Sequence, residues 1–154
     1  MASYYLDTSA LVKAYTHETG TAWVRLLIEP ARGHIVYTVR LTGPETVAAL
    51  GRKARTGELT ATAAAYAISA FRRSWRRHTH VVSVTVALAE QAMDLAVRHG
   101  LRGYDAVHLA AALLIANRQR DVGLSALTFV SADTDQRQAA MAEGLLVENP
   151  NAYP

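Results

Sequence analysis

Short apolar runs alternate with longer amphipathic segments along the chain. Strands are predicted where β-branched and aromatic residues cluster, at 3–6, 34–38, 81–84, 127–131 and 145–148. Helices are predicted where apolar residues recur every three or four positions, at roughly 9–16, 19–29, 43–56, 60–78, 86–99, 104–120 and 134–143. Strands that alternate with helices in this way indicate an α/β domain built on a parallel sheet.

Glycines mark the ends of three predicted helices. Gly100, Gly123 and Gly144 each follow a helical pattern, where a left-handed residue commonly ends the last turn. There is no internal repeat, low-complexity tract or interdomain linker. We therefore expect one domain over residues 1–148, followed by an irregular tail over 149–154.

Composition narrows the class of protein. The 154 residues are 51% hydrophobic and 19% charged, which is typical of a compact soluble domain. The absence of cysteine excludes disulfides, zinc–thiolate sites and thiol nucleophiles. The longest apolar run, 109–116, is far shorter than the roughly 20 residues of a membrane span, and the first residues lack the basic start of a signal peptide. A cytoplasmic protein is the expectation.

The charge balance weakly favours a polyanionic partner, because the net charge is +3 and most of the basic residues are arginines. The helix predicted at 60–78 places four arginines on a face opposite Phe71 and Trp75. These are Arg72, Arg73, Arg76 and Arg77. Such a stripe could bind the phosphates of a nucleic acid or the carboxylates of a protein partner. A plain solvated face is the alternative.

Four acidic residues lie at or near the starts of predicted helices: Asp7, Glu45, Asp105 and Asp133. Because the carboxyl ends of parallel strands lie along one edge of a sheet, we expect these side chains to converge on one crevice. Each acid alone has another explanation, since free N–H groups at a helix start favour a carboxylate. Together they would repel, by about 3 kcal/mol for two charges about 5 Å apart at an effective dielectric of about 20. A divalent cation such as Mg²⁺ or Mn²⁺ would neutralise the group.

Several other catalytic patterns are absent. The chain has no G-x-x-x-x-G-K-[ST] loop and no G-x-G, which argues against a nucleotide-phosphate cradle. It also has no G-x-S-x-G elbow, which argues against an α/β-hydrolase. The acidic crevice is therefore the main candidate for chemistry.

Three strings in the chain resemble a known nuclease family, the PIN domains. They are DTSALVKAYTHETG at 7–20, LRGYDAVHLAAAL at 101–113 and LTFVSADTDQRQAAMAEGLLVENP at 127–150. The resemblance spans nearly the whole chain in the family's order and covers the first, third and fourth acids closely. It departs before Glu45, where Gly43 and Pro44 stand in place of the bulkier residues that are usual there.

The resemblance implies a three-layer α/β/α fold with a central parallel sheet of four to five strands. As a single short domain, the chain is most similar to the VapC-type toxins of toxin–antitoxin pairs. This implies an endoribonuclease dependent on Mg²⁺, with Mn²⁺ as a substitute, whose metal is held by the four acids. It also implies a homodimer and a small VapB-like antitoxin made alongside it.

Residues near the acids complete the candidate site. Ser9 could orient the Asp7 carboxylate or cap a helix, and Asp135 is expected to start a helix or act from outside the metal ligands, with Asp133 preferred as the ligand. His108, one turn after Asp105, is interpreted as a scaffold residue rather than a ligand. Two alternatives remain open. One is a catalytically silent binding module, and the other is a related nuclease that acts on DNA.

Overall fold

A parallel sheet forms the centre of the molecule. The computed structural model describes all 154 residues, and its five strands lie in the order β3-β2-β1-β4-β5. They are β1 (Ser3–Leu6), β2 (Ile35–Val39), β3 (His80–Val82), β4 (Leu127–Val130) and β5 (Leu146–Glu148). Every pairing is parallel. The five predicted strands are confirmed, although the third begins one residue earlier than expected and ends two residues earlier.

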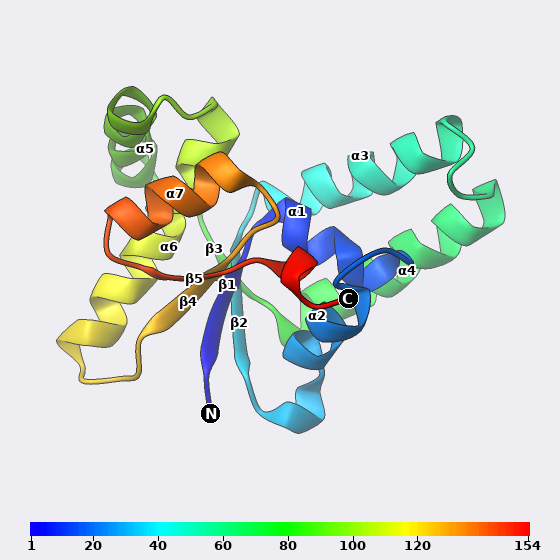
Figure 1. Ribbon diagram of the computed structural model, residues 1–154, viewed down its shortest axis with the longest axis horizontal. Helices are drawn as coiled ribbons and strands as arrows, with labels where there is room; N and C mark the ends of the chain where they lie inside the picture. Colours follow the sequence, from blue (N-terminus) through cyan, green and yellow to red (C-terminus); the bar gives the residue numbers. More distant parts are fainter.

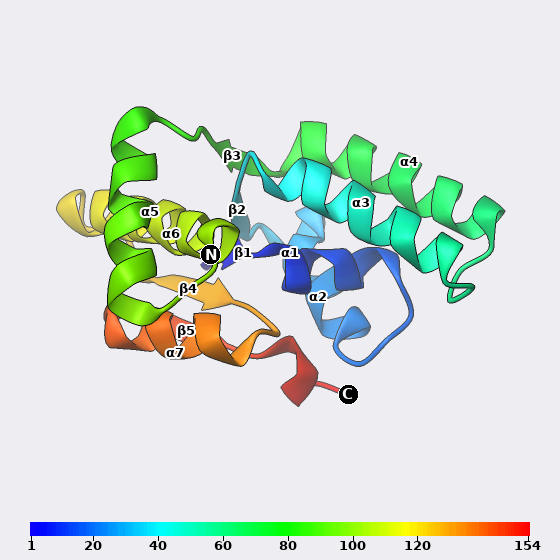
Figure 2. The ribbon, with the colours of Figure 1, turned by 90° about the horizontal axis from the view of Figure 1, so that it is seen from above.

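Seven α-helices cover the two faces of the sheet. They are α1 (Thr8–Leu11), α2 (Thr21–Ile28), α3 (Thr42–Arg55), α4 (Ala61–His78), α5 (Val86–His99), α6 (Gly103–Asp121) and α7 (Thr134–Ala142). Figures 1 and 2 show α1 to α4 on one side of the sheet and α5 to α7 on the other. The expected three-layer α/β/α architecture is therefore confirmed.

Three short 3₁₀ helices supplement the α-helices. They are η1 (Val12–Tyr15), η2 (Pro30–Arg32) and η3 (Pro150–Ala152). The helix predicted at 9–16 is thus α1 continued by η1. The glycines expected at helix ends, Gly100 among them, have positive φ angles. At Gly100, φ is 63°, and its N–H donates to the carbonyl of Ala96 to close α5.

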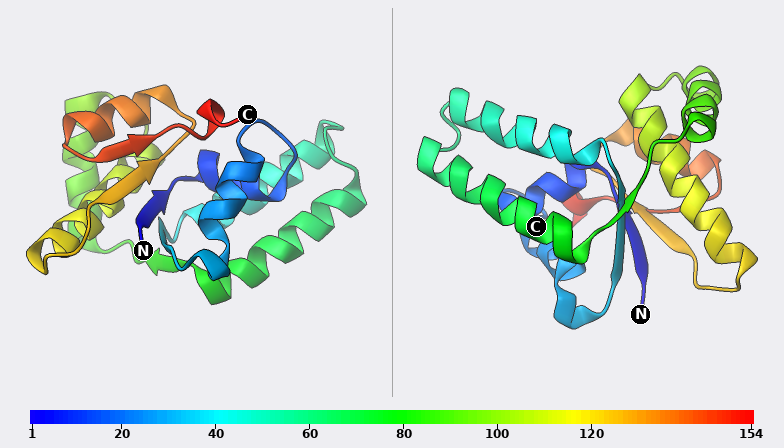
Figure 3. Two further views of the ribbon diagram at one scale, coloured as in Figure 1. Left: turned by 60° about the horizontal axis from the view of Figure 1, so that its bottom comes forward. Right: turned by 180° about the vertical axis from the view of Figure 1, so that it is seen from behind.

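The two layers of helices pack differently against the sheet. The cluster under α5, α6 and α7 contains 18 buried residues, and the cluster under α1, α2 and α4 contains nine. In the larger cluster, Ala110, Ala111 and Ala112 are fully buried, which allows α6 to lie close to the strands. On the other side, α3 and α4 form a hairpin that extends away from the sheet, as both views of Figure 3 show.

The carboxyl ends of the strands lead directly into helices at one edge of the sheet. Asp7 separates β1 from α1, and the chain passes from β4 to α7 through residues 131–133. Figure 1 shows α1, α3 and α7 beginning above this edge. The strand order reverses across β1, because the chain moves from β1 to β2 on one side and later returns to β4 on the other. Such a switch point is where open α/β sheets bind ligands.

The last residues lie against α2. The Tyr153 ring stacks on Trp23, with ring centroids 4.2 Å apart, and its hydroxyl donates to the Glu148 carboxylate. Gly20 allows this approach, because its φ is 87° and an added Cβ would collide with the carbonyl of Pro150. The division into a domain and a tail at residue 148 stays a prediction. None of the helices has the length and apolar character needed to cross a membrane.

Candidate active site

The four predicted acids line one cleft at the carboxyl edge of the sheet, with a volume of about 540 Å³. They arrive from four elements, namely the start of α1, the first turn of α3, the first turn of α6 and the start of α7. The polar residues that share the lining with them are Thr8, Ser9, Arg52, Arg102, Tyr104, His108 and Gln136. The convergence expected from strand order is thus present in the structure.

Asp7 forms the floor of the cleft and is only 1% exposed. Its Oδ1 accepts hydrogen bonds from the Ser9 hydroxyl (2.7 Å) and the Ala10 N–H (2.9 Å). Its Oδ2 accepts from the Ser131 hydroxyl (2.6 Å) and the Gln136 side-chain amide (3.1 Å). Burial raises the pKa of the Asp7 carboxyl, and the donors oppose that rise. The carboxylate is therefore fixed in position by four donors.

Asp105 lies across the cleft from Asp7 and is joined to it through one nitrogen. The Gln136 Nε2 donates to Asp105 Oδ1 at 2.9 Å as well as to Asp7 Oδ2. Burial raises the pKa of Asp105, and the nearby negative charges of Asp133 and Asp7 add to that rise. The two carboxylates are thus close enough to compete for one positive group.

Glu45 approaches from α3 and is held by a histidine. The His108 Nε2 lies 2.9 Å from Glu45 Oε1, and its Nδ1 lies 3.0 Å from the Tyr5 hydroxyl. A carboxylate only accepts hydrogen bonds, so Nε2 must carry a proton, and in the neutral ring Nδ1 accepts from Tyr5. Burial raises the pKa of Tyr5 well above its ordinary value, which keeps that phenol a donor. His108 is buried and holds the Glu45 carboxylate through this hydrogen bond.

Asp133 lines the cleft and also caps a helix. Its Oδ1 accepts from the backbone N–H of Gln136 at 2.9 Å, which caps the first turn of α7. Asp135, two residues later, is exposed and does not line the cleft. The structure therefore places Asp133 at the cleft and Asp135 outside its lining.

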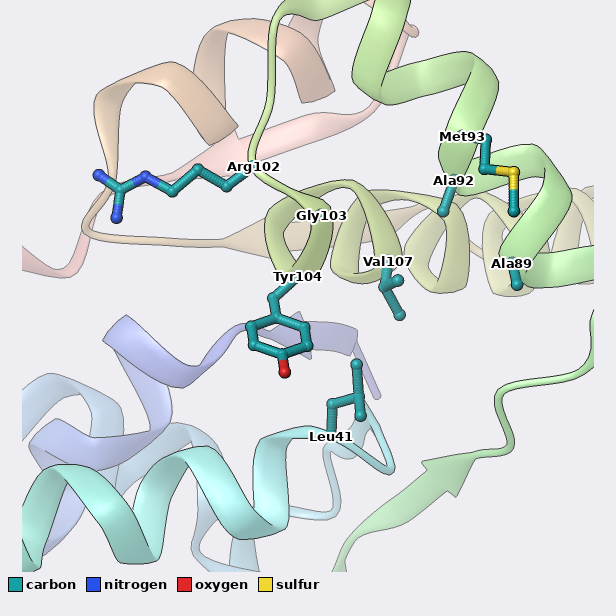
Figure 4. Close-up of a pocket in the computed structure, with 8 residues that line it drawn as sticks. All are labelled: Leu41, Ala89, Ala92, Met93, Arg102, Gly103, Tyr104 and Val107. Atoms are coloured by element: carbon teal, nitrogen blue, oxygen red, sulfur yellow. The ribbon is translucent and has the colours of Figure 1, made fainter.

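Two arginines bring positive charge to the cleft. Arg52 from α3 and Arg102 at the start of α6 both line it and are otherwise exposed to solvent. Arg102 also lines an adjoining pocket of about 540 Å³ together with the apolar side chains of Leu41, Met93 and Val107. Figure 4 shows Tyr104 extending from the first turn of α6 toward the start of α3. Tyr104 contributes to both hollows.

The donor set suits a hard divalent cation. No group of three or more acidic or histidine side chains lies close enough together to enclose one. However, Asp7 and Asp105 lie within hydrogen-bond distance of the same nitrogen. Mg²⁺ is commonly bound through one or two carboxylates and completes its shell with water and substrate phosphate. The pair fits that arrangement, with Glu45 and Asp133 also lining the cleft.

A match to a protein family covers all four acids, because residues 4–141 match the PIN domain. The chain belongs to the PIN-domain family. This PIN domain is 38% identical over 117 residues to ribonuclease VapC45 of Mycobacterium tuberculosis strain CDC 1551, an alignment that covers 76% of the chain and 79% of that relative. Ribonuclease VapC49 of the H37Rv strain matches to the same extent.

Solved structures share the fold. The crystal structure of Mycobacterium tuberculosis VapC20, a toxin that cleaves the sarcin–ricin loop, aligns with a TM-score of 0.60 and 24% identity, covering 98% of this chain and 99% of that one. A toxin–antitoxin complex from Klebsiella pneumoniae aligns with a TM-score of 0.62 and 17% identity, covering 97% and 98%. At such identities the likeness concerns the fold.

Two features of the PIN domain were not predicted from the sequence or differ from the prediction. Gln136 and Ser131 donate hydrogen bonds to Asp7, although they lie more than 120 residues away in the sequence. For Gln136, the only signal in the sequence was its position as a polar residue one turn after Asp133. Two of the four arginines predicted to lie opposite Phe71 and Trp75 in fact lie beside them. Arg72 and Arg76 line a groove of about 550 Å³ together with Phe71 and Trp75. The Trp75 ring is only half-buried, so the arginines next to it on α4 border the same groove.

Proposed function

We propose that this PIN domain is an endoribonuclease dependent on Mg²⁺ or Mn²⁺ and the toxin of a type II toxin–antitoxin pair. The proposal rests mainly on one observation. Asp7 and Asp105 both accept a hydrogen bond from the side-chain nitrogen of Gln136. Glu45 and Asp133 line the same cleft. The relatives named as ribonucleases support RNA as the substrate.

In the proposed site, Asp7 and Asp105 hold the cation, with Glu45 and Asp133 acting directly or through water. When bound, the cation would supply an activated water and neutralise charge on the phosphoryl oxygens. The donors around Asp7 fix its carboxylate in one orientation, and His108 keeps Glu45 directed into the cleft. A water oxygen would attack phosphorus while the bond to the 3′-oxygen breaks, and the leaving 3′-oxygen would take up a proton, which gives a 5′-phosphate and a 3′-hydroxyl.

Arg52 and Arg102 are suited to bind the RNA backbone beside the acids. Both are exposed and line the acidic cleft. A guanidinium group matches two phosphate oxygens at once, and contacts of this kind carry no sequence information. These arginines would therefore position the strand without selecting its bases.

The cleavage experiment uses the purified protein with a labelled RNA and a DNA of the same sequence. We expect cleavage of the RNA in Mg²⁺ or Mn²⁺, none in excess EDTA, and little or none of the DNA. Undiminished cleavage in EDTA would refute the metal mechanism, and equal cleavage of DNA would favour the DNA-directed alternative. A protein that cleaves neither strand would favour the silent binding module.

The proposed antitoxin is expected on the surface near 9–29 and 43–78. The groove between α3 and α4, where Arg72 and Arg76 flank Phe71 and Trp75, lies within this region and offers both apolar and positively charged contacts. Expression of the toxin alone should slow growth, and co-expression of an adjacent small open reading frame should restore it. An Asp7→Asn variant expressed to the same level is the control and should be harmless.

A further inference from the structure

The side-chain amide of Gln136 lies between two of the four acids. This residue is only 3% exposed, and its side chain ends between Asp7 and Asp105. Only an amide N–H can face two carboxylates, so the nitrogen must be the atom between them. The Oε1 on the other side of the amide is buried and has no hydrogen-bond partner.

The buried carboxylate of Asp7 has no free acceptor position for a cation. Its two oxygens already accept four hydrogen bonds, two on each, and a carboxylate offers about four lone-pair sites. A cation that binds Asp7 must therefore replace one of the four donors. The identity of that donor follows from how firmly each of them is held.

Three of the four donors are fixed. The Ala10 N–H belongs to the first turn of α1. The Ser9 hydroxyl also accepts the N–H of Ala132 at 2.9 Å, and the Ser131 hydroxyl also accepts the N–H of Asp133 at 3.0 Å. Moving either serine would leave a part-buried backbone N–H without its partner, which costs stability.

Gln136 is the donor that can leave. Its side chain has three rotatable bonds, and its oxygen has no partner to lose. It is also the donor that Asp7 shares with Asp105, so its departure frees an oxygen on each of the two carboxylates at once. A cation in this position would attract the two carboxylates more strongly than the amide does, because it carries a full positive charge and the amide only a partial one.

We propose that the Gln136 amide holds the place between Asp7 and Asp105 in the metal-free protein and is displaced when a divalent cation binds. Gln136 is then a positioning residue that opposes metal loading, not a ligand. It stabilises the empty site by separating two like charges, at the cost of weaker affinity for the cation. This inference rests on the proposed metal-dependent function.

The test measures Mn²⁺ affinity by calorimetry and the melting temperature with and without Mn²⁺. Gln136→Met keeps the length of the side chain and removes the donor. We expect the metal-free variant to melt at a lower temperature and to bind Mn²⁺ about tenfold more tightly, because it no longer has to break hydrogen bonds to a charged group. Gln138→Met, at an exposed position of α7, is the matched control and should bind like the wild type.

A second variant keeps the inference testable if Gln136→Met does not fold. Gln136→Lys places a full positive charge near the two carboxylates, and should raise the melting temperature of the metal-free protein and greatly weaken Mn²⁺ binding. Unchanged or weaker binding by Gln136→Met would overturn the inference while wild-type binding still supports the metal site. Weaker binding would mean that Gln136 stays as a ligand. If the wild type does not bind Mn²⁺ at all, the inference and the proposed metal mechanism both fail.

Discussion

The two ends of the acidic cleft hold their carboxylates in different ways. Asp7 at the floor is almost fully buried and accepts four hydrogen bonds. The Glu45 side chain at the wall is 27% exposed, and its one hydrogen bond within the protein is to His108. The first carboxylate is fixed by the sheet edge, whereas the second depends on one contact between α3 and α6.

This difference follows from the elements that carry the two residues. Asp7 directly follows the central strand, and its four donors come from α1, from the segment after β4 and from α7. Glu45 belongs to the hairpin of α3 and α4, which extends away from the sheet and packs Leu50 and Ala67 against Val12 in a cluster of only three buried residues. We infer that substitutions at the floor act on charge, while substitutions at the wall act on position.

The largest effect is expected at the floor. Asp7→Asn should lower RNA cleavage by more than about a hundredfold, since loss of a ligand should exceed the 10–100-fold typical of outer-shell losses. The fold should persist, because the asparagine oxygen can still accept from the Ser9 hydroxyl and from the Ala10 N–H that starts α1. Cleavage rates and circular dichroism measure the two effects, with Asp94→Asn on the exposed side of α5 as control. An unfolded Asp7→Asn protein would mean that this residue serves mainly as a helix cap.

Cleavage should also depend on His108, because this residue holds Glu45 at the wall of the cleft. His108→Gln should lower cleavage by about 10–100-fold by releasing Glu45, and a Glu45→Gln variant should respond little to the added change. The control is His99→Gln, because His99 makes a similar contact with Glu143 away from the cleft, at 2.7 Å. Equal losses in the two histidine variants would show a general effect on stability rather than on the aim of Glu45.

A smaller effect separates the two acids that follow β4. Asp133→Asn should cost at least about tenfold in cleavage at limiting Mg²⁺, and Asp135→Asn should cost less. Asparagine can still cap α7, so the loss at Asp133 would reflect its charge in the cleft. A Mg²⁺ titration of both variants measures this, and equal or reversed losses would overturn the preference for Asp133.

The smallest effect concerns the stability of the metal-free protein as pH changes. The folded-state pKa of Asp7 is raised above its ordinary value of 3.8, so the native state holds its proton more tightly than the unfolded chain. That contribution to stability is present below pH 3.8 and is lost as pH rises through the raised pKa. Asp7→Asn should therefore be more stable than the wild type at neutral pH, with an advantage that shrinks toward pH 3.8. Urea melts in EDTA would measure it, and a difference that stays constant with pH would contradict a raised pKa at Asp7.

The sequence predicted the fold more fully than the site. Alternating strands and helices are local patterns, and all five strands and seven helical segments appear near their expected positions. The strand ends also predicted which acids would share an edge. The contacts of Gln136 and Ser131 with Asp7 could not be foreseen, because they join residues 129 and 124 positions apart. Side-chain hydrogen bonds over such separations depend on packing that no local pattern records.

One feature of α7 bears on how copies of this chain could decay once selection for cleavage is lost. Asp133 caps the helix through the N–H of Gln136, whereas Asp105 caps nothing and is crowded by its acidic neighbours. An inactive descendant would gain stability by losing the carboxylate at Asp105 and would lose stability by losing the cap at Asp133. In such a descendant, substitutions should accumulate at Asp105 first, whereas position 133 should keep a residue that can cap a helix, namely Asp, Asn, Ser or Thr. A silent copy would then still look half intact at the sequence level.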